Sequence, residues 1–393
     1  MTAVALWVVG LALGLLLYAY VGYPLVLWLL GRLRRPPTGA DLAAADWPMV
    51  SISISAYNEE AQIRELIKSL LALDYPRDRL QVLIISDGST DATDAIVAEY
   101  AGQGIELLRM PERGGKTKAE NAASGLLRGE IVVNTDASTR ILPGSLEPLV
   151  AAMRDPTVGC ASGRDVSVGA QEGDANRGES GYVGYEMAVR DLETRVSGII
   201  GASGCFYAIR AALHRVPLPG SLSRDFAAAL HAREHGYRAV SVSQATCLVP
   251  RGQSLRKEYR RKVRTIARGM RTLWHKRALM NPVRHGVFAW MLLSHKVCRW
   301  LLPWAALAAL LALVALAPGQ LWARVVLAPA LVVLALGLAG WLVAERARLP
   351  KLLAAPAFLL AGNVAAAHAL VRVLAGGEDA LWEPTRREVV KAG

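Results

Sequence analysis

The chain has 393 residues, room for two or three domains, and its 53% hydrophobic content with a mean hydropathy of +0.28 excludes a wholly soluble protein. Of the net charge of +12, a surplus of eleven lies between Arg251 and Arg284, directly before an apolar segment, so it indicates attraction to membrane lipids and argues against a nucleic-acid partner. The four cysteines show no CxxC spacing, which argues against a thiol redox site or a cysteine zinc site.

A first apolar segment begins almost at the N-terminus. Ala5–Leu30 contains no Asp, Glu, Lys or Arg and exceeds the roughly 20 residues that cross a bilayer. A cleaved signal peptide is the alternative, but the run is longer than a signal peptide's hydrophobic region and no positive charge precedes it. We therefore predict a retained transmembrane anchor over residues 1–31. Arg32, Arg34 and Arg35 follow it and place the next domain in the cytoplasm by the positive-inside rule.

Strands and helices alternate after a short linker at Pro36–Gly39. Each predicted strand ends in a polar turn: Met49–Ser55, Gln81–Ser86, Ile105–Arg109 and Glu130–Asn134. This rhythm predicts an α/β domain over residues 48–250 with a largely parallel sheet. Ligands bind beyond the carboxyl ends of the strands in such sheets, so functional residues are expected in these turns.

The part of this domain between residues 140 and 250 is less regular in sequence. Gly169–Gly184 is rich in glycine and charge, and we expect irregular structure there. A strand is predicted at Cys205–Ile209 and a helix after Asp225.

From Leu255 onward the spacing of apolar residues becomes helical. The apolar positions are Leu255, Tyr259, Val263, Ile266, Met270 and Trp274, and the opposing basic stripe is Arg256, Arg260, Arg264, Arg268 and Arg271. This pattern predicts basic amphipathic helices over residues 251–285 that lie in the membrane interface with the apolar face in lipid. The alternative is a soluble amphipathic helix packed on the α/β domain.

Three more charge-free segments follow, at Trp300–Ala317, Val325–Val343 and Leu352–Val371. They predict a C-terminal transmembrane bundle over residues 286–376, followed by a polar tail over residues 377–393. With the α/β domain in the cytoplasm, three crossings would leave the basic tail outside, against the charge rule. Either the last segment, which contains Pro356, does not cross fully, or the stretch from Gly286 contributes a crossing.

Acidic residues stand at the predicted turns of the α/β domain: Glu59, Asp87, Asp136 and Asp225. Each alone is also ordinary turn or cap chemistry, with Asp225 as the N-cap of the helix that follows it. Together they suit a divalent cation and a diphosphate, because Mg²⁺ binds one or two carboxylates plus phosphate oxygens. Lys116, after Gly114 and Gly115, adds positive charge opposite the same phosphates.

Six short motifs carry a resemblance to a known family: Ser55-Ala56-Tyr57-Asn58-Glu59-Glu60, Ile85-Ser86-Asp87-Gly88-Ser89, Gly114-Gly115-Lys116, Asp136-Ala137-Ser138, Gly204-Cys205-Phe206 and Arg224-Asp225. Their order and spacing over residues 49–270 resemble the family 2 inverting glycosyltransferases, in particular the membrane-integrated members related to cellulose and hyaluronan synthases. The tail at Leu381–Arg387 resembles the end of many such chains. The resemblance implies a GT-A (Rossmann-like) domain that binds a nucleotide sugar, with N-terminal and C-terminal transmembrane helices.

The resemblance also implies roles for individual residues. The implied donor-binding residues are Ala56, Tyr57, Glu59, Asp87, Lys116, Asp136 and Arg264. Among them Tyr57, Glu59 and Asp87 contact the base and ribose, and Asp136 faces the sugar diphosphate with its Mg²⁺ or Mn²⁺. Asp225 is the implied general base, which takes a proton from the acceptor hydroxyl as it attacks the anomeric carbon.

The implied partners are a nucleotide-sugar donor, UDP-linked by family habit, a lipid-linked or glycan acceptor, and membrane lipids. The implied setting is polysaccharide or glycolipid biosynthesis for the cell envelope, at the plasma (inner) membrane with the catalytic domain in the cytoplasm.

Two departures from the family pattern limit what it implies. Asp136-Ala137-Ser138 stands where the family has Asp-x-Asp, so Asp136 and Ser138 are the remaining candidate metal ligands and the case for a metal is weaker. Lys262, Thr265 and Ile266 stand where processive synthases have the Gln, Arg and Trp of a Gln-x-x-Arg-Trp motif. Because that Trp stacks on the growing sugar chain, its absence predicts addition of one or a few sugars, with Lys262 and Arg264 still facing the diphosphate.

Three other sequence patterns suggest alternatives to this interpretation. A phosphate-binding P-loop ending in Gly115-Lys116-Thr117 requires glycine where Met110 stands. His231 and His235 have zinc-protease spacing, but no third ligand is indicated and a solvated helix face is expected. A processive polysaccharide synthase, and a catalytically degenerate membrane scaffold that binds sugar nucleotides, stay open; the scaffold is motivated by Ser138.

Overall fold

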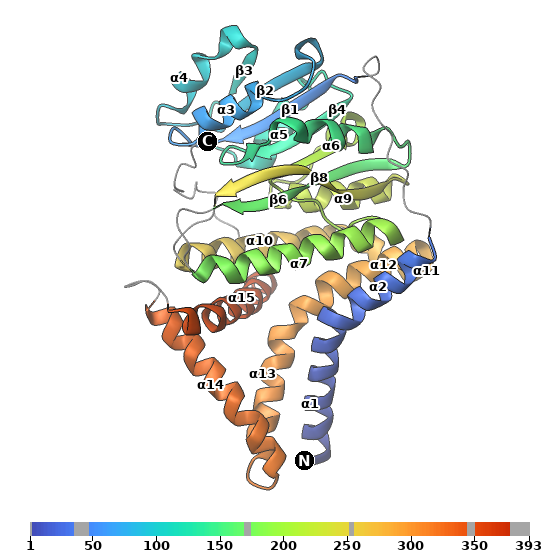
Figure 1. Ribbon diagram of the computed structural model, residues 1–393, viewed down its shortest axis with the longest axis vertical. Helices are drawn as coiled ribbons and strands as arrows, with labels where there is room; N and C mark the ends of the chain where they lie inside the picture. Colours follow the sequence, from blue (N-terminus) through green and yellow to red (C-terminus); the bar gives the residue numbers. More distant parts are fainter. Residues whose placement is uncertain (1, 35–46, 169–173, 251–254, 344–349, 378–393) are drawn as a thin grey trace.

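The structure is a computed structural model that describes residues 2–34, 47–168, 174–250, 255–343 and 350–377. The predicted linker at Pro36–Gly39 and the tail motif at Leu381–Arg387 lie outside the described residues. Figure 1 shows an α/β domain above a group of long helices, with two helices, α7 and α10, lying between them.

One sheet of eight strands forms the centre of the described α/β domain, in the order β3-β2-β1-β4-β7-β6-β8-β5. The strands are β1 (Val50–Ala56), β2 (Leu80–Ser86), β3 (Ile105–Arg109), β4 (Ile131–Asp136), β5 (Arg140–Ile141), β6 (Val158–Val168), β7 (Phe206–Arg210) and β8 (Arg238–Pro250). β1 pairs in parallel with β2 and β4, and β2 with β3, as predicted. β7 runs antiparallel to β4 and β6, so the complete sheet is mixed.

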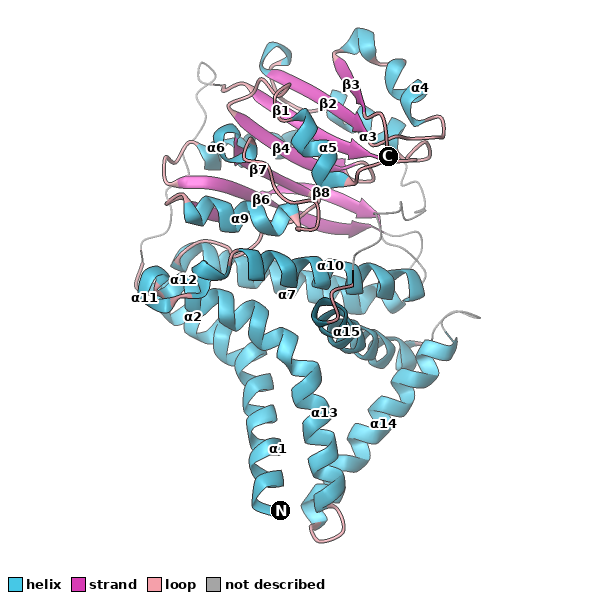
Figure 2. Cartoon of the chain, turned by 180° about the vertical axis from the view of Figure 1, so that it is seen from behind, coloured by secondary structure: helices cyan, strands magenta, loops and turns pink. Residues whose placement is uncertain are grey.

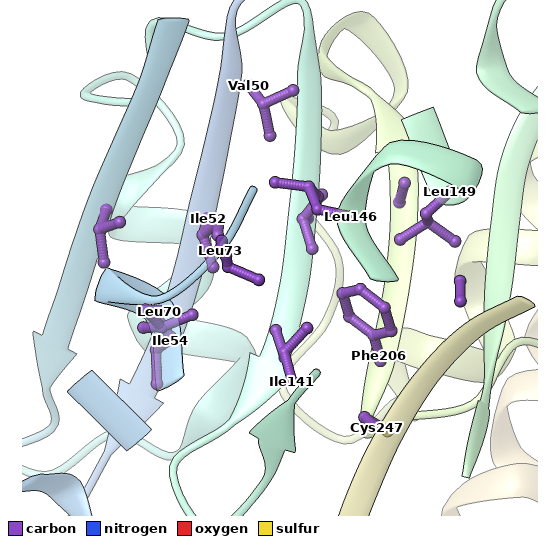
Figure 3. Packing of buried hydrophobic residues seen from close by; sticks show 14 of the residues in the cluster. Val50, Ile52, Ile54, Leu70, Leu73, Ile141, Leu146, Leu149, Phe206 and Cys247 are labelled. Carbon is purple, nitrogen blue, oxygen red and sulfur yellow. The ribbon is translucent and has the colours of Figure 1, made fainter. Parts of the chain in front are cut away.

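Helices cover both faces of the sheet. On one face Val50, Ile52 and Ile54 of β1 pack with α3 (Ile63–Leu71), α4 (Thr93–Ala98) and α6 (Leu146–Met153) around Phe206, as Figure 3 shows for part of this core. The other face is covered by α5 (Lys116–Ala123), α8 (Ala211–His214) and α9 (Arg224–Glu234). Each buried aliphatic side chain contributes about 1.5–3 kcal/mol, and the period of two along β1 follows from strand geometry.

The expectation of irregular structure at Gly169–Gly184 is wrong from Asp174 onward, where the helix α7 (Asp174–Val196) begins. The sequence between residues 140 and 250, which looks less regular, also contains two long strands, β6 and β8. Glycines lower the intrinsic helix propensity of the α7 sequence, but Val189 and Val196 are buried against Leu27, and such packing outweighs propensity. The strand predicted at Cys205–Ile209 is confirmed as β7.

Four helices in the described ranges are long and apolar enough to cross a membrane: Thr2–Arg32, Val287–Leu316, Leu321–Val343 and Leu352–Leu374. They contain α1 (Thr2–Leu17), α2 (Tyr23–Arg32), α12 (Val287–Leu292), α13 (Cys298–Leu316), α14 (Leu321–Val343) and α15 (Lys351–Leu374). π-helical turns at Tyr18–Gly22 and Leu293–Val297 join the two halves of the first two spans. The stretch after Gly286 is thus the beginning of the second span, and α1 lies beside α13 in both views (Figures 1 and 2).

The basic amphipathic sequence forms α10 (Leu255–His275), followed by the short α11 (Pro282–His285). Val263 and Ala267 of α10 pack against Ala365 and Ala369 of α15. The apolar face that was expected in lipid is therefore covered by protein at these positions. α10 lies beside α7 under the sheet (Figure 2), and it also contacts the α/β domain, where the backbone N–H of Ser223 donates to the Thr272 hydroxyl.

Candidate active site

The carboxyl ends of three parallel strands bring the predicted turn residues to one edge of the sheet. Ala56 ends β1, Asp87 directly follows β2 and Asp136 ends β4. The strand register pairs Ala56 with Ser86 and Ser55 with Asp136. The backbone N–H of Asp87 donates to the carbonyl oxygen of Ala56 at 2.8 Å. The turn residues that were expected to share one edge of the sheet therefore lie together there.

The turn after β1 presents an aromatic ring at this edge. The Arg113 guanidinium lies 3.9 Å from the centroid of the Tyr57 ring. Asn58 has φ 51°, in the left-handed region, and its backbone N–H donates to the Ser89 hydroxyl. Glu59 is 5% exposed, so its side chain is buried beneath the turn. The turn thus joins the ends of β1 and β2 and places Tyr57 beside the Gly-rich loop that contains Arg113, Gly114 and Gly115.

Both carboxylate oxygens of Asp87 bind that Gly-rich loop. The backbone N–H groups of Gly114 and Gly115 donate to Oδ1 and Oδ2 at 2.8 and 2.7 Å. Gly115 has φ 86°, and at Gly88, with φ 71°, a Cβ would lie 3.0 Å from the backbone nitrogen of Arg113. Glycine is required at both positions, and Asp87 positions the start of α5 in this structure.

Lys116 begins α5 and lies between two carboxylates. Its Nζ is 2.6 Å from Asp136 Oδ1 and 3.9 Å from Glu120 Oε1. Burial lowers the pKa of Lys116, but the charges of Asp136 and Glu120 outweigh it and raise the pKa above its usual value, so the ammonium stays charged at neutral pH. Cys205 Sγ lies 4.0 Å from the other oxygen of Asp136.

The candidate metal ligands offer one carboxylate and one hydroxyl. Ser138 is 8% exposed and lies two residues after Asp136. Among the described residues, no three His, Cys, Asp or Glu side chains are grouped to hold a metal ion. This donor set fits a cation shared with a diphosphate, because Mg²⁺ usually takes one or two carboxylates and completes its shell with phosphate oxygens and water.

Asp225 lies in the first turn of α9. Ser223 occupies the N-cap position, and its hydroxyl donates to Asp225 Oδ1 at 2.5 Å. The alternative role of Asp225 as the N-cap of this helix is therefore wrong. At Gly204 a Cβ would lie 3.0 Å from Asp225 Oδ2, so a larger residue there would press on the carboxylate. Asp225 is also close enough to Lys116 to raise the pKa of that lysine.

Two buried charged residues beneath this edge form an ion pair that the sequence did not predict. The Arg224 Nε lies 2.8 Å from Glu120 Oε2, and the two side chains are 5% and 0% exposed. Arg224 belongs to a quoted motif, but its partner has no sequence signal. A single Glu among the lysines and alanines of α5 is typical of a solvated helix face.

The basic helix α10 contributes a different residue from those expected. The Arg268 guanidinium donates to the Thr117 hydroxyl at 3.1 Å, next to Lys116. Arg264 lies one turn earlier and is partly buried. Lys262 was expected to face the diphosphate, but its Nζ lies 3.6 Å from the centroid of the Phe358 ring on α15.

The two histidines with zinc-protease spacing lie at the end of α9. His231 is 5% exposed, so the expected solvated face is wrong for this residue. Its Nδ1 lies 3.3 Å from Glu234 Oε2, which also pairs with Lys276 at 2.5 Å. Lys276 follows α10, and the packing of that helix end on α9 explains the burial.

Comparison with known proteins agrees with this geometry. Residues 51–215 match the model of Glycosyl transferase family 2. The beta-monoglucosyldiacylglycerol synthase of Nostoc sp. is 33% identical over 156 residues, which are 39% of this chain and 33% of that protein. The N-acetylglucosaminyltransferase of Mesorhizobium japonicum is 34% identical over 134 residues, 33% of this chain and 31% of that protein. The chain thus spans about a third of the length of these relatives.

Among solved structures, the mannosyltransferase PcManGT from Pyrobaculum calidifontis, in complex with GDP-Man and Mn²⁺, superimposes with a TM-score of 0.71. The identity is 25%, and the match covers 94% of this chain and all of that one. The mixed sheet and the long helices therefore recur together in a structure that contains a nucleotide sugar and a metal. Residues 51–215 of the chain thus form a Glycosyl transferase family 2 domain with a GT-A-like mixed sheet, and this domain carries Asp87 and Asp136.

Proposed function

We propose that this chain transfers a sugar from a nucleotide-sugar donor to a hydroxyl of a membrane-presented lipid-linked or glycan acceptor, with inversion at the anomeric carbon. The observation that carries the proposal is the grouping of Lys116, Asp136 and Asp225 at one edge of the sheet. An inverting displacement needs positive charge behind the leaving group and a base on the opposite side of the sugar. Lys116 supplies the first and Asp225 the second.

On the donor side, the Tyr57 ring and the Arg113 guanidinium form a flat surface that suits a nucleotide base. Lys116 binds the diphosphate. Asp136 and Ser138 would hold a Mg²⁺ or Mn²⁺ ion, which when bound would supply charge stabilisation for the departing diphosphate. We propose a UDP-linked donor, and the GDP-Man bound by PcManGT makes a GDP-linked sugar the first alternative to measure.

On the acceptor side, Asp225 accepts the proton of the attacking hydroxyl. The acceptor oxygen forms the new bond to the anomeric carbon while the bond from that carbon to the diphosphate oxygen breaks. The nucleoside diphosphate leaves with the electron pair, next to Lys116. Asp225 is partly exposed, and the absence of a side chain at Gly204 leaves room beside its Oδ2 for an acceptor hydroxyl.

We propose that the product carries one or a few added sugars. Ile266 stands on α10 where processive relatives have a Trp, and it packs among apolar residues at the contact between α10 and α15. An aliphatic side chain in that contact offers no aromatic face for a growing glycan. A ladder of long products from the purified protein would instead support a processive synthase.

We place the catalytic domain on the cytoplasmic side of the plasma membrane. The basic residues of α10, together with Arg32 at the end of α2 and Arg34 after it, support this orientation. α15 packs along α10 beneath the domain, which supports a last segment that does not cross the bilayer completely.

The test uses membranes that contain the full chain, with labelled UDP-glucose, UDP-N-acetylglucosamine and GDP-mannose offered separately, each with Mn²⁺ or with EDTA. We expect one donor to label a lipid-extractable product. Asp225→Asn should lower the rate about 10²- to 10⁴-fold, because it removes the base, while nucleotide binding stays unchanged.

Asp155→Asn is the matched control, because Asp155 pairs with Arg238 and precedes β6, at the opposite edge of the sheet. It should keep the wild-type rate. If the protein binds a nucleotide but labels no product, and Asp225→Asn changes nothing, the chain is a scaffold and the proposal fails. Wild-type transfer by Asp225→Asn would remove Asp225 as the base.

A further inference from the structure

Glu120 is a fully buried carboxylate that the mechanism above does not use. It lies on α5 with 0% exposure, between Lys116 on its own helix and Arg224 on α9. Ionised side chains are costly to bury unless they are paired. Burial raises the pKa of Glu120, and the two neighbouring cations oppose that shift. A charge in such a place is retained only if its partners hold it.

The first partner joins Glu120 to the donor side. Lys116 lies one turn before Glu120 on the same face of α5, and its ammonium donates to Asp136 at 2.6 Å and lies 3.9 Å from Glu120 Oε1, within ion-pair distance. The Lys116 side chain is thus held from below by a carboxylate that cannot move into solvent. This contact keeps the ammonium at the end of α5, where the diphosphate is proposed to bind.

The second partner joins Glu120 to the acceptor side. Arg224 is the residue directly before Asp225, and its Nε binds Glu120 while its Nη1 donates to Asn121 Oδ1 at 2.7 Å. Two consecutive residues of α5 therefore hold the first residue of α9. A third bond, from Nη2 to the carbonyl oxygen of His214 at 3.0 Å, fixes the guanidinium plane.

We propose that Glu120 is a positioning residue that sets the place of the donor-side cation and the acceptor-side base relative to each other. The inference rests on the proposed function. Lys116 and Asp225 come from different helices, and Glu120 contacts Lys116 directly and Asp225 through the adjacent Arg224. Displacing reacting groups by about 1 Å can cost on the order of 10² in rate, so a fixed separation between cation and base has a direct effect on turnover.

The first test is Glu120→Gln in the full chain, with the donor that the wild type uses. We expect kcat to fall about 10- to 100-fold, with the donor KM changed less than about threefold, because the Tyr57 and Asp87 contacts remain. Rates are normalised to the number of sites that bind UDP or GDP, so a loss of folded protein does not lower the measured kcat. The ratio of acceptor transfer to donor hydrolysis should also fall, because water needs less alignment than the acceptor hydroxyl.

The second test removes both charges of the pair. Glu120→Leu with Arg224→Leu leaves no uncompensated buried charge, and such replacements are often neutral or stabilising for folding. We expect this double variant to bind UDP or GDP in full yet to stay at least 10-fold slow. Recovery of the wild-type kcat per site would show that the pair serves folding alone, and would overturn the inference.

Glu99→Gln is the control, because Glu99 forms an ion pair with Arg64 in which both side chains are largely exposed. It should keep the wild-type kcat and transfer ratio. Wild-type values in Glu120→Gln as well would refute the positioning role while leaving the proposed function intact. If the wild type itself labels no product with any donor, the proposed function has failed instead.

Discussion

At the scale of single residues, the buried polar groups around Arg224 extend to His214. This histidine is 2% exposed, and its Nε2 lies 3.3 Å from Asn134 Oδ1 and 3.3 Å from the Arg224 Nη2. Burial, followed by the charges of Arg224 and Arg215, lowers the pKa of His214 well below its usual 6.5. The imidazole is therefore neutral in the folded protein at pH 6, whereas it is largely protonated in the unfolded chain.

This difference predicts a loss of stability in mild acid. As the pH falls through 6.5 the unfolded state comes to bind up to one more proton than the folded state. The contribution of His214 to the free energy of unfolding is therefore fully present above pH 6.5 and decreases below it, by at most about 1.4 kcal/mol per pH unit. We expect the Tm of the full chain in detergent to fall between pH 7.5 and 5.5, and to fall less steeply in His214→Gln. His275→Gln, a change at an exposed histidine, should keep the wild-type slope; equal slopes in all three proteins would contradict the account.

The same scale shows which site residues a sequence can reveal. Asp87 and Asp136 were predicted because each follows a recognisable buried strand, and the register then brings them together. Arg268 was not predicted because its partner Thr117 is on α5, and the Glu120–Arg224 pair was not predicted because Arg224 is on α9. No local pattern carries that information.

At the scale of elements, the alternation of strand and helix patterns in the sequence made β1 to β4 predictable. The other elements depend on tertiary packing. α7 was not predicted because its glycines lower the helix propensity of the sequence, whereas the helix is stabilised by burial of Val189 and Val196. The apolar face of α10 was recognised from the spacing of its apolar residues. A spacing of three to four residues shows that a helix has an apolar face, but it does not show what packs against that face. Whether that face meets lipid or α15 depends on where α15 lies.

Close approach between elements gives a test at this scale. Gly129 precedes β4, and a Cβ there would lie 2.4 Å from the backbone nitrogen of Ser51 and 2.8 Å from the carbonyl oxygen of Ile131. Backbone atoms on both sides cannot move aside without disturbing the pairing of β1 with β4. We expect Gly129→Ala to destabilise the protein by about 1–3 kcal/mol, measured as a lower Tm.

Gly125→Ala is the matched control for this change. It lies in the turn after α5, and its Cβ would meet nothing within 4 Å. An unchanged Tm is expected for it. If the two variants behave alike, the close approach at Gly129 does not limit packing.

At the scale of the whole molecule, three distant parts of the chain meet in one buried polar contact. The Tyr23 hydroxyl of α2 donates to Glu193 Oε1 of α7 at 2.6 Å, and His295 Nδ1 lies 2.6 Å from the same oxygen. Glu193 is 0% exposed. Glu193 thus joins the first two candidate spans to α7, and Glu186 of the same helix adds a second contact to His295 at 3.0 Å. Composition predicted four spans, but this junction depends on tertiary packing and has no sequence signature.

Tyr23→Phe tests the junction by removing one hydrogen bond to a charged group. Such a bond contributes about 1.5–3 kcal/mol, so we expect a lower Tm for the full chain in detergent. Tyr20→Phe is the control, since the Tyr20 hydroxyl makes no hydrogen bond among the described residues. A Tm loss of equal size in both variants would assign the effect to the ring environment and not to the junction.

The π-helical turns at Tyr18–Gly22 and Leu293–Val297 lie next to this junction and touch each other, since the Tyr18 hydroxyl lies 2.6 Å from the Ser294 hydroxyl. A π-helical turn takes up one residue more than an α-helical turn, so the α-helices on its two sides keep nearly the rotational phase of an uninterrupted helix that is one residue shorter. Deleting a single residue within Tyr18–Gly22 would therefore restore an ordinary α-helix with Tyr23 still facing Glu193, whereas deleting one within α1 would rotate α1 by about 100° relative to Tyr23. The first span thus accommodates its extra residue at the turn without changing which face of α2 meets α7.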